Sequence, residues 1–190
     1  MATQDRIRWD QIYRDRAGLP YPEPHPLLFE FTPPVEPERD LRALDLAGGL
    51  GQNALWLSTQ GYVVDLLDIS RAGLLRAQEE MARRGLRRVN LLQVDLDHAQ
   101  LEQEAYALVC VFNFLKRELF PALRACLQPG GRIIYETFNR RYLQLVPGFN
   151  PDYLLEIGEL AGYFADWRLL HYQEGDHIAR LVAVKPPPDQ

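Results

Sequence analysis

From residue 41 onward, short apolar runs alternate with segments of helical periodicity, and this alternation limits the possible folds more than any other feature of the sequence. The apolar runs are rich in leucine and β-branched residues, as expected of strands that are buried on both faces. The pattern predicts an α/β fold in which helices connect the strands of a doubly wound, mostly parallel sheet. We expect strands over 41–47, 62–67, 89–94, 106–113 and 131–137, and helices over 52–60, 71–84 and 116–127.

The C-terminal part of the sequence departs from this alternation. After a helix expected over 152–164, two strand-like runs at 167–172 and 177–184 are separated only by the segment QEGD, with Gly175 in the turn. A parallel crossover needs about a dozen or more residues, so these two strands cannot be parallel neighbours. We expect an antiparallel hairpin, which brings the sheet to seven strands.

The N-terminal part precedes the alternating pattern. Residues 5–16 carry apolar side chains within a charged background and predict a short amphipathic helix. Residues 19–37 are rich in proline, which lacks the amide hydrogen that a helix interior or a central strand requires. We therefore expect a helix and a wrapping arm over 1–40, followed by one domain over 41–190.

The formal net charge of −5 and the isoelectric point near 5.4 argue against a protein that grips a phosphate backbone, because such binding depends on positive charge. We do not expect a nucleic-acid partner. One basic cluster is interpreted as the solvated end of an amphipathic helix. It consists of Arg83, Arg84, Arg87 and Arg88.

Several features bear on the compartment. No apolar stretch approaches the ~20 residues that span a bilayer, so no membrane association is expected. The first residues are too polar for an export leader. Cys110 and Cys126 form no CxxC pair and are interpreted as buried free thiols. These features indicate a reducing, cytoplasmic compartment.

The strongest local signal is the segment Asp45–Gly51, DLAGGLG, which lies between a predicted strand and a predicted helix. A ligand can approach the backbone only where no side chain intervenes, and glycine also permits the dihedral angles of such a turn. A plain strand-to-helix turn explains a lone glycine-rich segment equally well.

Two carboxylates follow neighbouring strands. Asp68 ends the second strand, where an exposed carboxylate could accept hydrogen bonds from both hydroxyls of a ribose. Replacing it with alanine is therefore expected to weaken ligand binding and to leave the fold intact. Asp68 could instead cap the next helix, although Ser70 can serve that role, and Asp65 lies within the strand. Asp95 follows the third strand, where it could accept a hydrogen bond from an adenine amino group or simply start a loop.

These residues together resemble a known family. The ordered segments DLAGGLG, LLDIS, QVDL, VFNF and LQPGGRIIYETF are similar to the motif set of class I S-adenosylmethionine-dependent methyltransferases, over about residues 41–138. The segments WDQIY, GLGQNALWLS and LKRELFPALRACLQPGGRIIYETFN resemble the bacterial methyltransferases grouped with tellurite-resistance enzymes. The resemblance implies a Rossmann-like fold, S-adenosylmethionine as cofactor and methyl transfer as activity.

The resemblance also implies a set of cofactor-binding residues at the strand ends. They are Ala47, Gly48, Gly49, Gly51, Asn53, Asp68, Ile69, Asp95, Leu96, Phe112 and Asn113. The alanine and glycines would border the methionine part of the cofactor, and the last two residues would lie near its sulfonium. Asp68 would hold the ribose, while Ile69, Asp95 and Leu96 would surround the adenine. Ala47 departs from the family, whose pattern most often begins with glycine.

The methyl acceptor is expected to be a small molecule. Candidate residues on the acceptor side are Tyr13, Arg117, Glu136, Phe138 and Tyr142, although packing explains the last two aromatics as well. A carboxylate at the end of a strand, such as Glu136, is awkward in a core. It would serve as general base only if the acceptor arrives protonated. The four histidines lack metal-ligand spacing, so no metal is expected.

Two other functions fit parts of the sequence. The run Gly49–Ala54 satisfies GxGxxA, which also occurs in NAD(P)-dependent oxidoreductases, and the fold is compatible with a non-catalytic cofactor-binding module. Trp9 and Tyr13 are four residues apart and share a helix face. We hypothesise that this helix and the arm cover the cofactor as a partial lid, while packing on the edge of the sheet is the alternative.

Overall fold

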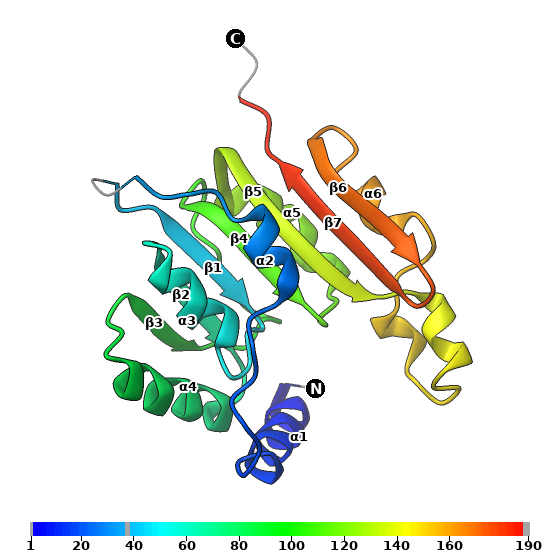
Figure 1. Cartoon of the computed structure of the whole chain (residues 1–190). Coiled ribbons are helices and arrows are strands. Elements are labelled where there is room, and N and C mark those ends of the chain that lie inside the picture. The colour runs from blue at the N-terminus through cyan, green and yellow to red at the C-terminus, as the bar shows by residue number, and fades with distance from the viewer. Residues whose placement is uncertain (1, 37–38, 188–190) are drawn as a thin grey trace. The chain divides into compact units, whose positions relative to one another are not determined.

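The computed structural model describes residues 2–36 and 39–187 of the chain (Figure 1). The described structure divides into two compact units, Met1–Gln100 and Leu101–Gln190. The organisation as one domain with an N-terminal arm stays a prediction. Within the described ranges, no helix is both long and apolar enough to cross a membrane.

The first unit contains four helices and three strands in its described residues. In chain order they are α1 (Ala2–Asp15), α2 (Pro26–Phe31), β1 (Arg42–Leu46), α3 (Gln52–Thr59), β2 (Val63–Asp68), α4 (Arg71–Arg84) and β3 (Val89–Gln93). The strands and helices expected between residues 41 and 94 are confirmed to within one residue at each end.

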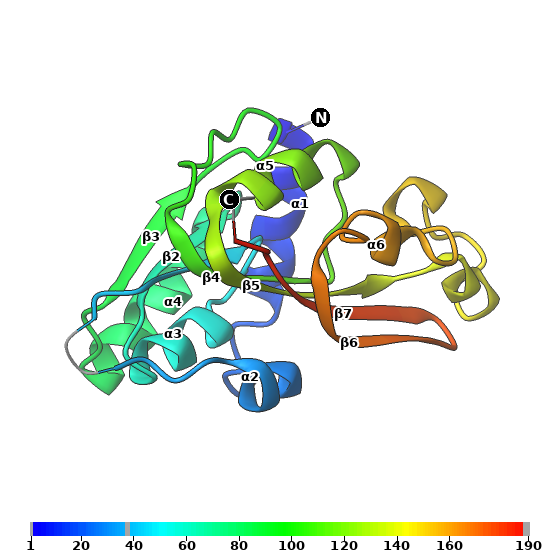
Figure 2. The same cartoon turned by 90° about the horizontal axis from the view of Figure 1, so that it is seen from above.

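The three strands of this unit are parallel, with β2 between β1 and β3. Figure 2 shows α3 and α4 on one face of these strands. Leu44, Leu46 and Leu66 are fully buried, so the apolar runs that predicted the strands form the core. The register pairs Leu46 with Leu67 and Asp68 with Gln93, and the carboxyl ends of all three strands therefore meet at one edge.

The arm contains a helix that was not expected. The sequence predicted no interior element in the proline-rich segment, but α2 begins at Pro26, and Leu27 and Leu28 are buried. Proline is tolerated at the first position of a helix because the amide hydrogen there would have no partner within the helix. The prediction was wrong because it treated every proline as a helix breaker. Of the N-terminal part predicted over 1–40, residues 1, 37 and 38 lie outside the described residues.

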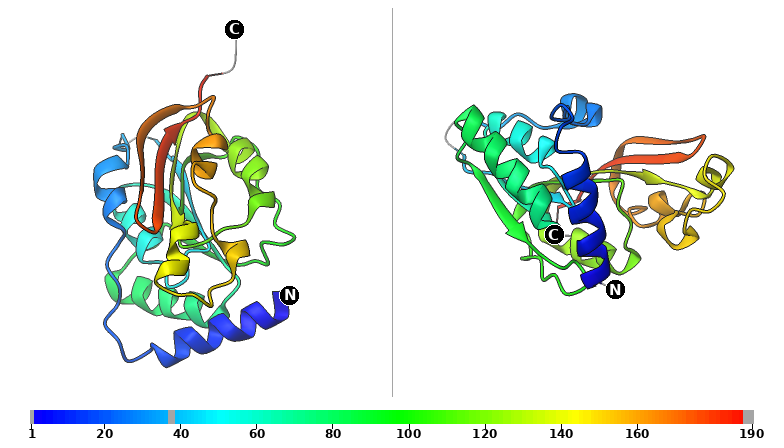
Figure 3. Two further views of the ribbon diagram at one scale, coloured as in Figure 1. Left: turned by 90° about the vertical axis from the view of Figure 1, so that its right-hand side faces the viewer. Right: turned by 90° about the horizontal axis from the view of Figure 1, so that it is seen from below.

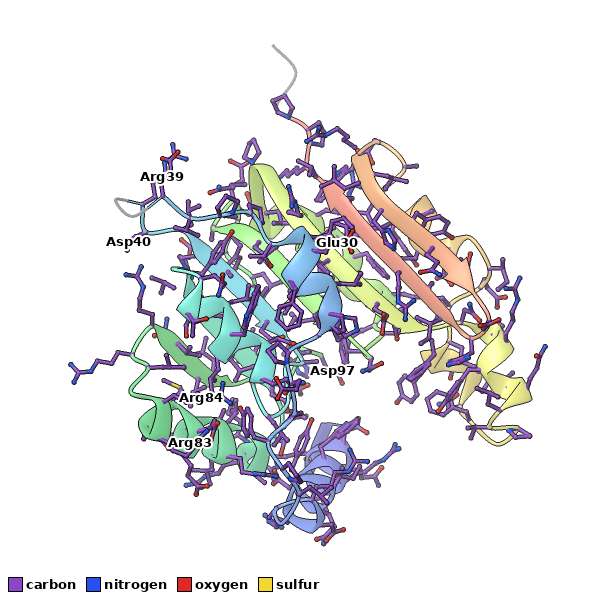
Figure 4. The ribbon with its side chains drawn as sticks, in the orientation of Figure 1. Glu30, Arg39, Asp40, Arg83, Arg84 and Asp97 are labelled. Carbon is purple, nitrogen blue, oxygen red and sulfur yellow. The ribbon has the colours of Figure 1, made fainter. Side chains whose placement is uncertain are left out.

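The basic cluster lies at the C-terminal end of α4, where Figure 4 labels Arg83 and Arg84. Both guanidinium groups pair with the carboxylate of Glu80, at 2.6 Å in each case. Hydrogen bonds from Arg83, and then from Arg84, lower the pKa of Glu80 to about 2. Arg88 pairs with Asp40.

The second unit is built on four strands. Its described elements are β4 (Tyr106–Phe112), η1 (Arg117–Leu119), α5 (Phe120–Cys126), β5 (Leu127–Phe138), η2 (Arg140–Gln144), η3 (Pro151–Tyr153), α6 (Glu159–Gly162), β6 (Arg168–Gly175) and β7 (Ile178–Val184). Strands β4 and β5 are parallel, whereas β7 is antiparallel to both β5 and β6. Figure 2 shows α5 and α6 on one face of these strands.

The strand order is β3-β2-β1-β4-β5-β7-β6, which confirms the predicted seven-stranded, mostly parallel sheet with a C-terminal antiparallel hairpin. The hairpin turn differs in detail from the prediction. The strands extend to Gly175 and Ile178, so Asp176 and His177 form the turn, and the positive φ of 39° falls on Asp176.

The helix predicted over 152–164 is wrong. The structure has only the short segments η3 and α6 there, because Gly158 adopts a left-handed φ of 82° that interrupts helical geometry. In addition, the guanidinium of Arg117 donates hydrogen bonds to the backbone carbonyls of Asp152 and Leu154. These two carbonyls therefore accept from a side chain, whereas in an α-helix they would accept from backbone amides four residues later.

The two cysteines match their interpretation from sequence. Cys110 and Cys126 are free thiols with no exposed surface. Burial raises the pKa of the Cys126 thiol to about 12. Both side chains therefore belong to the core of the second unit.

Candidate cofactor site

The glycine-rich turn and the carboxylate of β2 are in direct contact. The amide of Gly49 donates a 2.8 Å hydrogen bond to Oδ2 of Asp68, and the amide of Ser70 donates to Oδ1 at 2.8 Å. The carbonyl of Asp68 accepts from the amide of Val94, just after β3. The first unit thus brings two of the sequence signals together and places the end of the third strand beside them.

Each glycine of the turn has its own structural reason. Gly49 and Gly51 have φ of 59° and 77°, in the left-handed region that favours glycine. Gly48 has no such angle, but a Cβ there would overlap the side chains of Leu66 and Asp45. The carboxylate of Asp45 accepts from the amide of Ala54 at 3.1 Å and so holds the start of α3 against the turn.

Ala47 also occupies the left-handed region, with φ of 54°. Such a conformation costs a non-glycine residue roughly 1–2 kcal/mol. The departure noted in the sequence therefore falls on a backbone position where glycine would be relaxed. The surrounding turn holds this residue in place, since the amide of Gly48 bonds to the carbonyl of Leu67 on the neighbouring strand.

Asp68 is more enclosed than its position at a strand end suggests. The residue is only 6% exposed, and burial raises its pKa even though the amides of Ser70 and Gly49 donate to it. The expectation of an exposed carboxylate was wrong. The amide of Ile69 also contributes a hydrogen bond that lowers this pKa. Two carboxylate oxygens together offer about four lone-pair sites, so the carboxylate can accept from a further donor.

Asp95 starts a loop, as its alternative interpretation held. Its Oδ1 accepts from the amide of Asp97 at 2.9 Å, and its Oδ2 lies 3.1 Å from Nδ1 of His98. The side chain remains 32% exposed. Ile69 is half-buried and Leu96 is buried, so the two residues expected beside an adenine present different amounts of surface.

Asn53 lies in the turn region but anchors the arm. The residue is 3% exposed, and its Oδ1 accepts a 2.8 Å hydrogen bond from the amide of His25. In the described structure this side chain is directed toward the arm, because its oxygen holds the residue before α2. The sequence signal for a cofactor contact at this position came from the resemblance alone.

Tyr13, an acceptor-side candidate from the sequence, lies at the glycine-rich turn. A Cβ on Gly49 would overlap its hydroxyl, and a Cβ on Gly73 would come within 3.1 Å of its ring. Burial, and then the charge of Asp68, raise the pKa of the phenol. Trp9 stacks on Tyr13 with ring centroids 5.8 Å apart, as their four-residue spacing predicted.

Sequence reasoning missed three residues at this turn. Tyr21, from the arm, donates its hydroxyl to the carbonyl of Leu50. Asp10, on α1, accepts from Ser70 and from Ala72. Gln52, the first residue of α3, has a buried Oε1 for which the described structure provides no hydrogen-bond partner. Its place directly after Gly51 is the signal that could have identified it.

The remaining two predicted cofactor residues belong to the second unit. Phe112 ends β4 and is half-buried, and Asn113 follows it with an exposed side chain and a φ of 55°. The amide of Asn113 donates to the carbonyl of Glu136 at 2.9 Å. A positive φ on asparagine is uncommon, and it marks the end of this strand as a constrained position.

Arg117 is committed to its own unit. Its guanidinium donates to both carboxylate oxygens of Glu159, at 2.6 and 2.8 Å, and to two backbone carbonyls. Hydrogen bonding to Glu159 raises the pKa of the guanidinium. These donors hold the segment around η3, and the acceptor-side assignment of Arg117 stays a prediction.

Glu136 is likewise paired. The residue is 5% exposed, and its Oε2 accepts from Nε of Arg180 at 2.5 Å across the β5–β7 pair. Arg180 also donates to Gln173 on β6. The awkward carboxylate that sequence analysis singled out as a possible general base is thus part of an ion pair within the sheet.

Phe138 and Tyr142 pack in an aromatic cluster. Their rings stack with centroids 4.2 Å apart, and Phe149 meets both edge-on. His177 lies 6.4 Å from Phe138 and 5.9 Å from Tyr142. The packing interpretation accounts for these contacts, which are typical of aromatic pairs in a core.

Comparisons with known proteins give the same fold. The chain is 20% identical to TehB from Haemophilus influenzae, with a TM-score of 0.66 over 78% of this chain and 58% of that one. It is 14% identical to a geranyl diphosphate C-methyltransferase from Streptomyces coelicolor A3(2), solved with Mg²⁺, geranyl diphosphate and S-adenosyl-L-homocysteine. That likeness has a TM-score of 0.70 and covers 84% and 77% of the two chains.

Sequence comparisons place the chain in a family. It is 32% identical over 157 residues to Hemagglutinin 1 of Eikenella corrodens, which covers 78% of this chain and 51% of that protein. The chain therefore spans about half the length of this curated relative. The family model described as tellurite resistance protein TehB matches residues 30–181. Because this match covers most of the sequence, the chain belongs to the TehB family.

Proposed function

We propose that the chain is an S-adenosylmethionine-dependent methyltransferase that acts on a small-molecule acceptor. The observation that carries the proposal is the hydrogen bond between Gly49 and Asp68, which joins the glycine-rich turn to the carboxylate ending β2. In open α/β sheets, nucleotide-containing ligands bind beyond the carboxyl ends of the strands, at such a turn. Membership of the TehB family and the likeness to a solved methyltransferase with bound S-adenosyl-L-homocysteine support it.

The residues of the first unit fit such a cofactor. Asp68 retains acceptor capacity for ribose hydroxyls, and the partly exposed Asp95 offers oxygen acceptors to an adenine amino group. The half-buried Ile69 offers apolar surface for the ring, and the amide of Leu96 is a donor for a ring nitrogen. At the other end of the turn, the buried oxygen of Gln52 lacks a partner, and the amino group of a methionine moiety is a donor of suitable chemistry.

Methyl transfer from a sulfonium requires few catalytic groups from the protein. When bound, S-adenosylmethionine supplies a methyl group that its sulfonium already activates. The chain's own residues have to bind the cofactor, orient the acceptor and exclude water. Asp68 and the turn serve binding and orientation, and Tyr13, packed on Gly49, is placed to exclude water.

No general base is assigned. Glu136 is paired with Arg180, and the adjacent positive charge disfavours uptake of a proton by that carboxylate. We propose that the acceptor reaches the protein in a nucleophilic form, so that proximity alone suffices. We further propose a cytoplasmic location, which the two buried, free thiols support.

Isothermal titration with S-adenosylmethionine, S-adenosyl-L-homocysteine and NADH tests the cofactor class. The two sulfur compounds should bind in the micromolar range or tighter, and NADH should not bind. Tight binding of NADH alone would favour the oxidoreductase and overturn the proposal.

A turnover assay then separates an enzyme from a binding module. Formation of S-adenosyl-L-homocysteine should rise above background with at least one acceptor in a screen of small molecules, metalloid oxyanions, RNA and protein. Turnover with RNA or protein alone would contradict the small-molecule acceptor. Cofactor binding without any turnover would indicate a non-catalytic module.

A further inference from the structure

Helix α1 is attached to the cofactor turn at two points. Figure 3 shows α1 beside α4, and the two helices are in contact. At one point, Oδ1 of Asp10 accepts a 2.6 Å hydrogen bond from the hydroxyl of Ser70 and a 2.9 Å bond from the amide of Ala72. At the other point, Tyr13 packs against Gly49 and Gly73.

These contacts close a ring. The hydroxyl of Ser70 donates to Asp10, and the amide of Ser70 donates to Asp68. Asp68 in turn accepts from the amide of Gly49, on which the hydroxyl of Tyr13 rests. Asp10 and Tyr13 are three residues apart on one face of α1, so the helix itself connects the two ends of this chain of contacts. A displacement of α1 at Asp10 would therefore move the hydroxyl of Tyr13 relative to Gly49.

Asp10 is the polar anchor of this ring. It lies at the start of α4, where Ala72 has an amide without a helical partner and Ser70 caps the amide of Gly73. Burial raises the pKa of Asp10, but hydrogen bonds from Ala72 and Ser70 and the charge of Arg14 together lower it. The carboxylate is thus charged at neutral pH and faces α4.

We propose that Asp10 is a positioning residue for the cofactor site, which acts by holding the hydroxyl of Tyr13 over Gly49 so that this hydroxyl contacts the methionine part of the bound cofactor. The inference rests on the proposed function. It assigns α1 to the binding machinery and distinguishes it from a helix that merely covers the sheet.

The chain also holds α1 at its far end. The guanidinium of Arg76, on α4, donates to the carbonyls of Arg16 and Leu19, at 2.8 and 3.0 Å. These bonds fix the segment that follows α1 but do not reach the turn. Arg76 therefore keeps α1 near α4 when Asp10 is replaced, so that the loss of Asp10 changes the placement of Tyr13 and does not release the whole helix.

A double-mutant cycle tests the proposal, with the dissociation constant for S-adenosyl-L-homocysteine measured by titration. Asp10→Ala should weaken binding about tenfold or more, as should Tyr13→Ala. Because Asp10 acts through Tyr13, adding Asp10→Ala to Tyr13→Ala should weaken binding by less than about twofold. Thermal melts run in parallel, since a purely structural role would lower the midpoint equally in both backgrounds without coupling in affinity.

Two further variants sharpen the test. Asp10→Asn keeps the oxygen that accepts from both Ser70 and Ala72, so its affinity should stay within about threefold of the unmodified protein. Asp15→Ala is the matched control on the same helix, because Asp15 is exposed and its carboxylate accepts a hydrogen bond from Gln11, four residues earlier on α1. It should leave affinity unchanged.

The outcomes separate the two levels of the proposal. If the unmodified protein binds no S-adenosyl-L-homocysteine, the proposed function fails and this inference fails with it. If the unmodified protein binds but Asp10→Ala binds equally well, or if the losses from Asp10→Ala and Tyr13→Ala multiply, only the positioning role is overturned. Failure of Asp10→Asn to restore binding would likewise overturn it.

Discussion

The two units use charged residues at strand ends in different ways. In the first unit, the carboxylate of Asp68 accepts hydrogen bonds from the backbone amides of Gly49 and Ser70. In the second, Glu136 pairs with Arg180, and Arg117 pairs with Glu159. A carboxylate held by backbone amides keeps its charge facing a turn that a ligand can approach. A carboxylate held by arginine has its charge compensated within the fold.

We propose that this difference in partners distinguishes site residues from structural ones better than position along the strands does. The sequence singles out both Asp68 and Glu136 as carboxylates that end a buried strand, the first as a cofactor residue and the second as an acceptor-side candidate. Their hydrogen-bond partners distinguish the two carboxylates. We therefore expect replacement of Asp68 to change cofactor affinity, whereas replacement of the paired charges in the second unit should change stability alone.

The largest expected effect is on the turn itself. Gly48→Ala should destabilise the protein by about 3 kcal/mol, because the added Cβ would overlap Leu66 and the carboxylate of Asp45 in a packed region. Chemical denaturation measures this loss. Gly18→Ala is the matched control, since a Cβ there has open space, and it should change stability by less than about 0.5 kcal/mol. Equal stabilities for the two variants would contradict the close approach at Gly48.

Asp68→Ala should lose both affinity and stability. Removing the carboxylate leaves the amides of Gly49 and Ser70 without their acceptor, at about 1–3 kcal/mol of unfolding free energy, and weakens cofactor binding by about 1.5–3 kcal/mol. The sequence alone predicted an intact fold for this variant, because it placed the carboxylate at an exposed position.

Asp65→Ala separates the two losses. Asp65 is a buried acid of the same strand, and it is paired with Arg42 and Asn90, away from the turn. Its replacement should lower stability in denaturation and leave the titrated affinity unchanged. If both variants weaken binding to the same extent, the ribose assignment of Asp68 is wrong.

Arg117→Ala should destabilise by about 1–2 kcal/mol, because it removes four hydrogen bonds from a partly exposed guanidinium. Affinity for S-adenosyl-L-homocysteine should stay within about twofold of the unmodified protein. Arg141→Ala, at an exposed arginine of the same unit, is the control for loss of charge. A large loss of affinity without a loss of stability would instead indicate that Arg117 takes part in ligand binding.

The smallest effect concerns Glu80, whose pKa is lowered from 4.5 to about 2 by Arg83 and Arg84. A depressed folded-state pKa contributes stability above the ordinary value, and this contribution is lost as pH falls toward 2. Glu80→Gln should therefore be slightly less stable than the unmodified protein at pH 7, and the gap should close between about pH 4.5 and 2. Thermal melts across this range measure it, and a gap that widens on acidification would have the wrong sign.

The parallel core was predictable because strands buried on both faces read as continuous apolar runs. The absence of a continuous helix over 152–164 could not be predicted in this way. The apolar residues there have helical spacing, but the left-handed Gly158 and the hydrogen bonds from Arg117 prevent a continuous helix. The helix at Pro26 was missed because proline disfavours only the interior of a helix.

In the candidate site, the contact between Gly49 and Asp68 follows from two signals at neighbouring strand ends. The sequence could not reveal that Arg180, 44 residues after Glu136, neutralises that carboxylate, because such pairing depends on antiparallel register. Nor could it reveal Asp10, whose partners on α4 lie 60 and 62 residues away along the chain.

Hydrogen exchange with and without saturating S-adenosyl-L-homocysteine tests the central claim most directly, namely that the cofactor binds at the glycine-rich turn under α1. The account predicts slower exchange at three places in the first unit: the turn at 48–53, the end of β2 at 68–73, and α1 around residues 10–15. No added protection in any of these segments under saturating ligand would contradict the site. Protection of the first two segments without α1 would leave the turn as the binding site and remove Tyr13 and Asp10 from it.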